Sequence, residues 1–313
     1  MEKKILHITN GSSLTQYLNE LDFNGDFLTW HEMLCEGPTK LNIDSESFLT
    51  VRKDFLNDFY DIEIDESEYK MELRKLNDIE KYSEIVLWFE YDLFCHINMI
   101  AIISLLNEKQ IKLPISLVCS GRIPGELNLK GLSELTPEQI DQYFKNKIKL
   151  TAKDIDIAVS VWQIYCGKDH NLLIPFITKK TAFEYLGCCL KAHLNRFPNS
   201  ISGLSALEHN ILKIVSKYEI KSKHHLLGYA LNYQGYYGFG DIQLMRIIDK
   251  LDMFFEEKDN HLKLNRTGHE VLLMHRNFAS DLNDKMIFGN VTRIDFQFNK
   301  QENKLIKTIL HVN

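Results

Sequence analysis

The sequence is poor in cysteine and lacks any long apolar run. Its six cysteines show no Cys-x-x-Cys spacing, and Cys188 and Cys189 are adjacent, which argues against a disulfide framework and a zinc site. The longest apolar stretch, Leu93 to Leu106, is interrupted by His96 and Asn98 and is too short to cross a bilayer. The first ten residues turn polar at Thr9 and do not resemble a signal peptide. These absences predict a soluble, reduced, cytoplasmic protein without a membrane segment.

Several sequence motifs that would indicate a particular function are also missing. The chain has no Walker loop, no Gly-x-Gly-x-x-Gly fingerprint and no Gly-x-Ser-x-Gly elbow. Internal repeats and low-complexity tracts are absent as well. What is present is ordinary globular composition, with 44% hydrophobic residues over 313 positions, which excludes wholesale disorder and favours two domains.

The charge is unevenly distributed along the chain. The net charge is −6 overall, but residues 1–150 carry 16 basic against 26 acidic residues, whereas residues 151–313 carry 21 against 17. The first half is therefore acidic and the second mildly basic. This division indicates either two parts with different tasks or an acidic surface that keeps the first part soluble.

The first 130 residues alternate between strand and helix patterns. Glu84 to Phe89 is the clearest strand, because its apolar run is typical of a strand covered on both faces. The other expected strands are Lys4 to Thr9, Phe27 to Trp30 and Pro114 to Cys119. The helices expected between them are Ser12 or Ser13 to Glu20, Ser45 to Tyr60, Ser67 to Lys81 and Asp92 to Lys109, and Met33 to Thr39 is expected to be a loop. The alternation predicts an α/β domain with an open, mostly parallel sheet in three layers.

The rest of the chain has a mainly helical pattern. Residues 131–202 are expected to form a helical linker, with helices beginning at Thr136, at Ala152, and at Thr178 or Thr181, the last of these running to Arg196. Residues 203–313 are expected to form a winged-helix-like domain with a C-terminal extension. This domain is predicted to contain helices at Gly203 to Tyr218, Lys223 to Leu231, Ile242 to Leu251 and Arg266 to His275, and a hairpin at Phe254 to Leu264.

Polar side chains follow each predicted strand at its carboxyl end, where open parallel sheets bind ligands. The residues expected to line this crevice are Asn10, Gly11, Ser12, Ser13, Glu32, Glu36 and Asp92. Backbone N–H groups and hydroxyls at Asn10 to Ser13 are suited to phosphate, but the signal is weak and a simple Asn-Gly turn with a serine cap is the better explanation.

The same crevice admits a metal-centred interpretation. Glu32, Glu90 and Asp92 supply hard oxygen ligands of the kind that Mg²⁺ or Mn²⁺ prefers. Asp92 also stands where an N-cap belongs, so Glu90 is the more informative residue. In this interpretation Glu90 and His31 are the catalytic candidates, with His31 as general base.

The helical half contains one feature that favours nucleic acid. Its third helix carries Arg246 and Lys250 against Asp241 and Asp249, which is a poor phosphate-binding face and favours packing or protein contact. A basic cluster nevertheless surrounds its first two helices. The nucleic-acid candidates are therefore Lys213, Lys217, Lys221, Lys223 and Arg246.

Several phrases of the sequence resemble an uncharacterised bacterial family, the domain of unknown function 1835, in its longer two-part form. They are His7 to Ser13, Gly25 to Trp30, Cys35 to Pro38, Leu87 to Phe94, Gly203 to Glu208, Phe239 to Asp241, Leu264 to Gly268 and Phe288 to Thr292. Ser12 stands where the family often has Asp, and Asn290 replaces a glycine of the last phrase. The resemblance implies that the crevice and the helical half form one recurrent unit, and it implies no reaction.

Two functions remain open on the sequence. The first is a ligand-responsive binding or regulatory protein, whose crevice holds a small polar or nucleotide-like ligand and whose helical half contacts a partner. The alternative is a divalent-metal-dependent enzyme that acts on a phosphorylated or nucleotide substrate.

Overall fold

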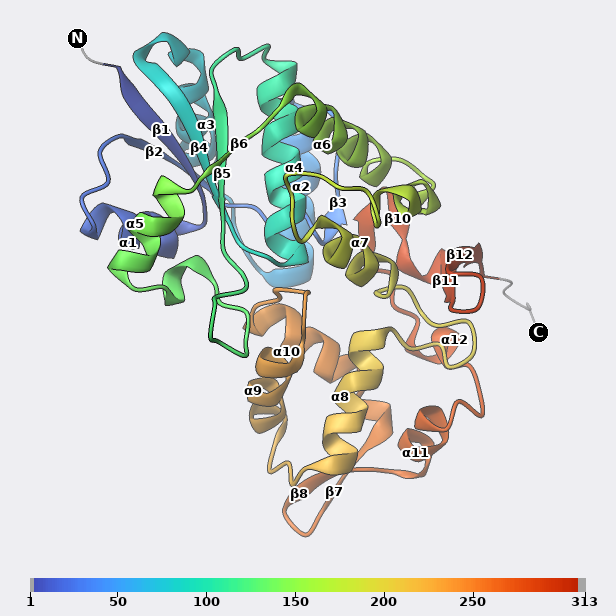
Figure 1. The fold of residues 1–313 in the computed structure, drawn as a ribbon. Helices are drawn as coiled ribbons and strands as arrows, with labels where there is room; N and C mark the ends of the chain where they lie inside the picture. The colour runs from blue at the N-terminus through green and yellow to red at the C-terminus, as the bar shows by residue number, and fades with distance from the viewer. Residues whose placement is uncertain (1–2, 309–313) are drawn as a thin grey trace.

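The computed structural model describes residues 3–308 and contains a five-stranded sheet in the strand order β2-β1-β4-β5-β6 (Figure 1). Its strands are β1 (Lys4–Asn10), β2 (Asp26–Trp30), β4 (Tyr82–Phe89), β5 (Ile115–Cys119) and β6 (Ile148–Lys149). The first four are parallel, as the sequence predicts, and β6 adds an antiparallel edge. Strands β2 and β4 flank β1, so the strand order reverses between β1 and β4.

Helices cover both faces of the sheet. They are α1 (Ser12–Glu20), α2 (Glu46–Tyr60), α3 (Glu66–Arg74), α4 (Leu93–Glu108), α5 (Pro137–Lys145), α6 (Ala152–Tyr165) and α7 (Leu186–Leu194). Alternate residues of β4 define the two sides, because side chains alternate along a strand. Val86 and Trp88 pack with α1 and α5, whereas Ile85 and Leu87 belong to the cluster built on α4 and α6. The predicted three-layer α/β architecture is therefore confirmed.

The helical half forms a second group of elements, which lies below the sheet in Figure 1. It comprises α8 (Ala206–Lys217), α9 (Lys223–Tyr233), α10 (Asp241–Lys250), β7 (Phe255–Lys258), β8 (His261–Leu264), α11 (Arg266–Leu272) and α12 (Ala279–Leu282). Strands β7 and β8 form the expected antiparallel hairpin, and Ile220 forms a single bridge to Leu262. Three helices are therefore followed by a hairpin, in the order that the sequence predicts.

The chain end returns to the α/β region. Its strands are β9 (Ile287–Gly289), β10 (Val291–Thr292), β11 (Phe296–Asn299) and β12 (Lys304–Lys307). Strand β9 pairs in parallel with β3 (Gly37–Pro38), inside the stretch that was expected to be a loop. The rest of Met33 to Thr39 is irregular, as expected. The expectation missed only β3, because its partner lies about 250 residues away in the sequence and no local pattern reveals such a pairing.

Two other local expectations also need correction. The helix expected from Thr178 or Thr181 begins only at Leu186, because the N–H groups of Ala182 and Phe183 donate to the side chains of Asp154 and Thr181. The helix expected to reach Lys81 ends at Arg74 and breaks into 3-10 turns. The 3-10 segments are Lys75–Asn77, Ile79–Lys81, Leu132–Glu134, His170–Phe176, Asp252–Phe254 and Arg293–Asp295. Within residues 3–308, no helix has the length and apolar character needed to span a membrane.

Candidate functional site

A cavity of about 270 Å³ hollows the carboxyl ends of β1 and β2, and we call it the edge cavity. Four of the predicted site residues line it: Asn10, Gly11, His31 and Glu32. The remaining lining is apolar, from Trp30, Met33, Leu56, Ile62 and Phe94. The structure thus brings the first two predicted loops together at one hollow, with a mixed polar and apolar wall of the kind that holds small molecules.

The turn after β1 is built on a glycine. Gly11 has a φ of 94°, which favours glycine, and its N–H donates to the Trp30 carbonyl at 3.1 Å. Helix α1 begins at Ser12, so Gly11 rather than a serine occupies the N-cap, and the expected serine cap is wrong. Ser12 and Ser13 are exposed in the first turn, where no side chain caps the helix. The N–H groups at the start of α1 therefore remain open to a ligand.

A buried amide holds the edge cavity in shape. Asn98 of α4 donates to Asn10 Oδ1 at 2.8 Å and to the Glu32 carbonyl, and its Oδ1 accepts from the Leu34 N–H at 3.1 Å. The Asn10 side-chain amide donates to Cys95 Sγ at 3.1 Å. Asn10 is therefore turned inward and fixes the loops, so it supports the cavity wall more than it offers a free amide.

Glu32 is paired with a buried arginine through one of its two carboxylate oxygens. Its Oε2 lies 3.0 Å from the guanidinium of Arg52, and both side chains are completely or almost completely buried. Burial raises the pKa of Glu32, while Arg52 acts in the opposite direction. Arg52 also donates to the carbonyls of Met33, Glu36 and Pro38, so this one side chain organises the loop after β2.

Glu36 joins the two halves of the molecule. Its carboxylate accepts from Arg246 at 3.0 Å, from Gln243 at 2.9 Å and from the Tyr60 hydroxyl. Arg246 also donates to Tyr60 at 3.2 Å and lies 3.5 Å from Asp284. Arg246 was predicted as a nucleic-acid contact, but its side chain is largely buried and its guanidinium is paired with Glu36 and Asp284, which makes it a poor contact for phosphate.

The carboxylates after β4 are held by backbone groups. Glu90 Oε1 accepts from the Leu132 N–H at 2.7 Å, and Asp92 caps α4 by accepting from the Cys95 N–H at 2.8 Å. Ligand atoms of Glu90, Asp92 and Cys95 all lie within 4.8 Å of one another. The predicted metal set of Glu32, Glu90 and Asp92 is thus corrected, since the Glu32 carboxylate is bonded to Arg52 and the third member of the group is a thiol.

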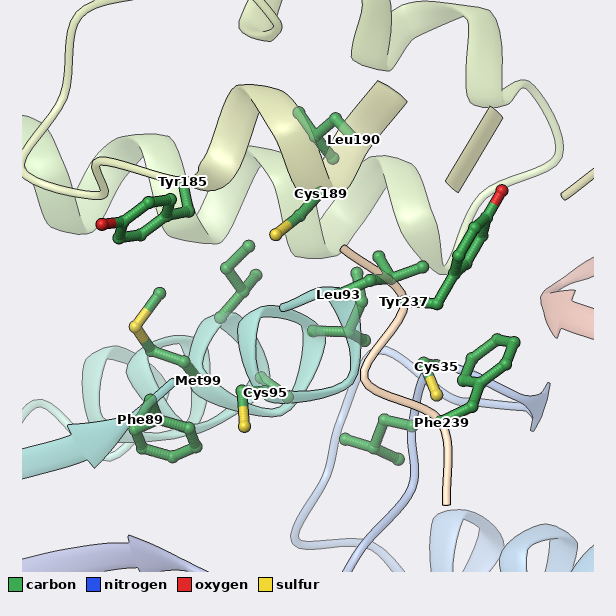
Figure 2. Close-up of a cluster of buried hydrophobic side chains, with 14 of the residues drawn as sticks. Cys35, Phe89, Leu93, Cys95, Met99, Tyr185, Cys189, Leu190, Tyr237 and Phe239 are labelled. Carbon is green, nitrogen blue, oxygen red and sulfur yellow. The ribbon is translucent and has the colours of Figure 1, made fainter. Parts of the chain in front are cut away.

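A loop of the helical half covers Asp92. The carbonyls of Tyr236 and Tyr237 accept from the N–H groups of Leu93 and Phe94, at 2.8 and 3.2 Å. Gly238 has a φ of 68°, and a Cβ there would lie 2.1 Å from Asp92 Cγ. Figure 2 shows Tyr237 and Leu93 within the same buried cluster. The first turn of α4 is therefore closed by residues that are about 140 positions away in the sequence.

Asp92 is the carboxyl group whose proton affinity the site alters most visibly. Burial, together with the neighbouring Glu90, raises its pKa from 3.8 to about 7. The hydrogen bonds from Cys95 act in the opposite direction but are weaker. Asp92 therefore exchanges a proton near neutral pH at the point where the two halves of the chain meet.

The remaining predicted residues are scattered. His31 is exposed at the rim of the edge cavity and makes no hydrogen bond within residues 3–308. Lys223 is bonded to Asp249 at 2.9 Å and to Asp252 at 2.8 Å, so its charge is offset. Lys213, Lys217 and Lys221 are exposed.

The sequence reasoning missed four residues that build the site, namely Arg52, Tyr60, Asn98 and Gln243. Two of them leave a signal in the sequence. Arg52 lies on the apolar stripe of α2, between Phe48 and Phe55, and Asn98, like His96, interrupts a largely apolar helix. A lone polar residue in an apolar stripe indicates a buried partner. Tyr60 and Gln243 leave no such signal.

Comparison with known proteins adds no relative. The sequence matches no protein-family model and no curated protein. The chemistry of the site itself is therefore the basis for assigning a function.

Proposed function

We propose that the chain is a ligand-responsive binding protein of the cytoplasm whose edge cavity holds a small polar or nucleotide-like ligand. The cavity lies at the carboxyl edge of the sheet, at the ends of β1 and β2 and beside the point between β1 and β4 where the strand order reverses. Open α/β sheets bind ligands at this edge. The open N–H groups of α1 follow Gly11 of the cavity wall. Together with Ser12 and Ser13, which lie next to that wall in the sequence but do not line it, they suit a phosphate of that ligand. The resemblance to the domain of unknown function 1835 is part of this proposal.

One observation carries the responsive part of the proposal. The helical half contacts the loops at the same edge of the sheet. Arg246 donates a hydrogen bond to Glu36, and the Tyr236 carbonyl accepts one from the first turn of α4. A ligand that shifts these loops acts directly on the helical half. We interpret that half as a winged-helix-like module that docks with its third helix on the α/β region. Its remaining surface is then the part that contacts a partner, whether protein or nucleic acid.

The test of ligand binding uses ribonucleoside monophosphates and inorganic phosphate as probes in a thermal-shift titration. Bound ligand raises the melting temperature by mass action. We expect a rise with at least one nucleotide, and a loss of that rise in Ser12→Glu, because the new carboxylate repels a phosphate at the start of α1. Asn19→Glu is the matched control, because it adds the same charge to an exposed position near the other end of the same helix.

The outcome separates the alternatives. Wild-type protein that responds to none of these probes contradicts a nucleotide-like ligand. An equal response in Ser12→Glu and Asn19→Glu places the ligand elsewhere. If only inorganic phosphate raises the melting temperature, the ligand is a small anion and not a nucleotide.

A metal-dependent enzyme is the second candidate, and the grouping of Glu90, Asp92 and Cys95 is the observation that favours it. Two of its carboxylate oxygens already accept backbone N–H groups, and burial raises the pKa of the Cys95 thiol well above its usual range. A protonated thiol is a poor partner for Mg²⁺ or Mn²⁺. We therefore expect no rise in melting temperature with Mn²⁺. A rise that Glu90→Gln abolishes would establish the enzyme as the better proposal.

A further inference from the structure

A second cavity, of about 410 Å³, lies in the helical half, and we call it the α8 cavity. It lies against α8, the loop after α9 and strand β11. Its polar residues include Lys213, His209, Asn210 and Lys300, and its apolar wall includes Phe197, Leu204 and Phe298. The cavity shares no lining residue with the edge cavity, so it is a separate site.

The α8 cavity differs from the protein's other cavities in its charge. It is lined by two lysines and no carboxylate, in a chain with a net charge of −6. Each of four other cavities in the described part of the chain has at least one carboxylate residue in its wall. Neither Lys213 nor Lys300 has a carboxylate within 4.0 Å among residues 3–308. The positive charge of this cavity is thus not offset locally.

The charges of both lysines act on His209, which also lines the cavity. Its pKa is lowered by burial and by the charges of Lys213 and Lys300, so the ring is neutral at neutral pH. Its Nδ1 is buried and makes no hydrogen bond within residues 3–308. The neutral ring therefore adds no positive charge to the cavity, whose charge comes from Lys213 and Lys300.

We propose that the α8 cavity binds a small organic anion, with its carboxylate, phosphate or sulfonate between Lys213 and Lys300 and its apolar body against Phe197, Leu204 and Phe298. Two ammonium groups provide charge-assisted hydrogen bonds to the anion, and the apolar wall provides burial for the rest of the molecule. This proposal is independent of the ligand in the edge cavity.

The position of the α8 cavity connects it with the contact between the two halves. Gln234, in its wall, donates to the Phe239 carbonyl at 2.9 Å and accepts from the Phe239 N–H at 2.7 Å. Tyr237, also in its wall, belongs to the loop that closes the first turn of α4. An anion in this cavity therefore touches the segment on which the docking of the helical half depends.

The test uses 1-anilinonaphthalene-8-sulfonate as the probe, because it joins a sulfonate to an aromatic body and fluoresces when bound. We expect Lys213→Glu/Lys300→Glu to weaken its binding at least about tenfold, on the order of one lost charge-assisted hydrogen bond. Lys217→Glu is the matched control, since it reverses an exposed charge one turn further along α8 outside the cavity. It should change the affinity less than about twofold.

Two further measurements make the result specific. Phenyl phosphate should displace the probe from wild-type protein, and the uncharged N-phenyl-1-naphthylamine should bind much more weakly than the sulfonate. Ser12→Glu should leave probe binding unchanged, which separates this site from the edge cavity. Equal affinity in the double variant and in Lys217→Glu, or equal binding of the charged and uncharged dyes, overturns the proposal.

Discussion

The carboxylates after β2 and those after β4 lie at the same edge of one sheet, but the protein stabilises them differently. Glu32 and Glu36 each face an arginine at 3.0 Å, Arg52 and Arg246 respectively. The positive charges of Arg52 and Arg246 are permanent, because a guanidinium does not lose its proton in proteins. The region after β2 is therefore a fixed ionic framework.

The region after β4 contains no such cation. Glu90 and Asp92 have no basic side chain within 4.0 Å among residues 3–308, and they accept backbone N–H groups instead. Burial then favours the protonated form of Asp92. The number of carboxyl groups in the crevice therefore does not give its negative charge. The carboxylates after β2 are paired with arginines, whereas Asp92 after β4 titrates at the contact between the two halves.

The largest effect is expected from breaking the fixed side. Arg52→Met keeps most of the side-chain volume but leaves the buried Glu32 carboxylate unpaired and releases three carbonyls. Removing one partner of a buried ion pair destabilises by about 3–5 kcal/mol. Urea unfolding should show this loss as a lower midpoint.

Two variants control this prediction. Arg74→Met removes an exposed arginine and should change stability by less than about 0.5 kcal/mol. Arg52→Met/Glu32→Gln should recover part of the loss, because the unpaired buried charge is gone. A loss below about 1 kcal/mol in Arg52→Met would mean that the pair is not structural.

A smaller effect is expected where the loop of the helical half meets the titrating side. Gly238→Ala places a methyl group against Asp92 and also requires φ of 68° from an L-residue. Overpacking costs about 1–3 kcal/mol, and the left-handed conformation adds about 1–2 kcal/mol. We expect a loss of roughly 3 kcal/mol, measured by urea unfolding.

Gly235 provides a control within the same loop. Its φ is 70°, nearly that of Gly238, but a Cβ there would have no atom within 4 Å. Gly235→Ala should therefore show the conformational cost alone, about 1–2 kcal/mol. If the two variants lose the same stability, the contact between Gly238 and Asp92 does not hold the halves together.

The sequence predicts the sheet well because its information is local. The apolar run of Glu84 to Phe89 indicates a strand covered on both faces, and β4 is buried from Ile85 to Phe89. The strand order is not local, and neither is the pairing of β3 with β9. The division at residues 130 and 203 stays a prediction.

The candidate site was predictable only as a set of loops. The carboxyl ends of β1 and β2 converge as parallel strands require, and Asp92 is the N-cap that its position indicates. The partners of Glu32 and Glu36 come from a helix and from the far half of the chain, at sequence separations of 20 and 210 residues. Which carboxylates keep their charge depends on those partners, so one-dimensional spacing cannot determine it.

The smallest effect is expected from titration of Asp92. Its pKa is about 7 in the folded protein and 3.8 as the reference for the unfolded chain. Between these values the folded protein holds a proton that the unfolded chain has lost, so stability from this site falls as pH rises toward 7 and is constant above it. Asp92→Asn keeps an acceptor for the Cys95 N–H but cannot titrate. The stability of the variant relative to wild type should therefore grow by about 2–3 kcal/mol between roughly pH 5 and pH 8.

The comparison of variant with wild type is needed because buried histidines act in the opposite direction. Burial lowers the pKa of His7 and His96 to about 4, so their contribution to stability rises with pH. These histidines are the same in both proteins and cancel in the difference. Asp65→Asn is the control, because Asp65 is an exposed N-cap whose pKa is lowered by hydrogen bonds from Ser67 and Glu68, so its difference should be small and of opposite sign. A difference between Asp92→Asn and wild type that does not change with pH would show that Asp92 stays ionised, and the two sides of the crevice would then not differ in charge.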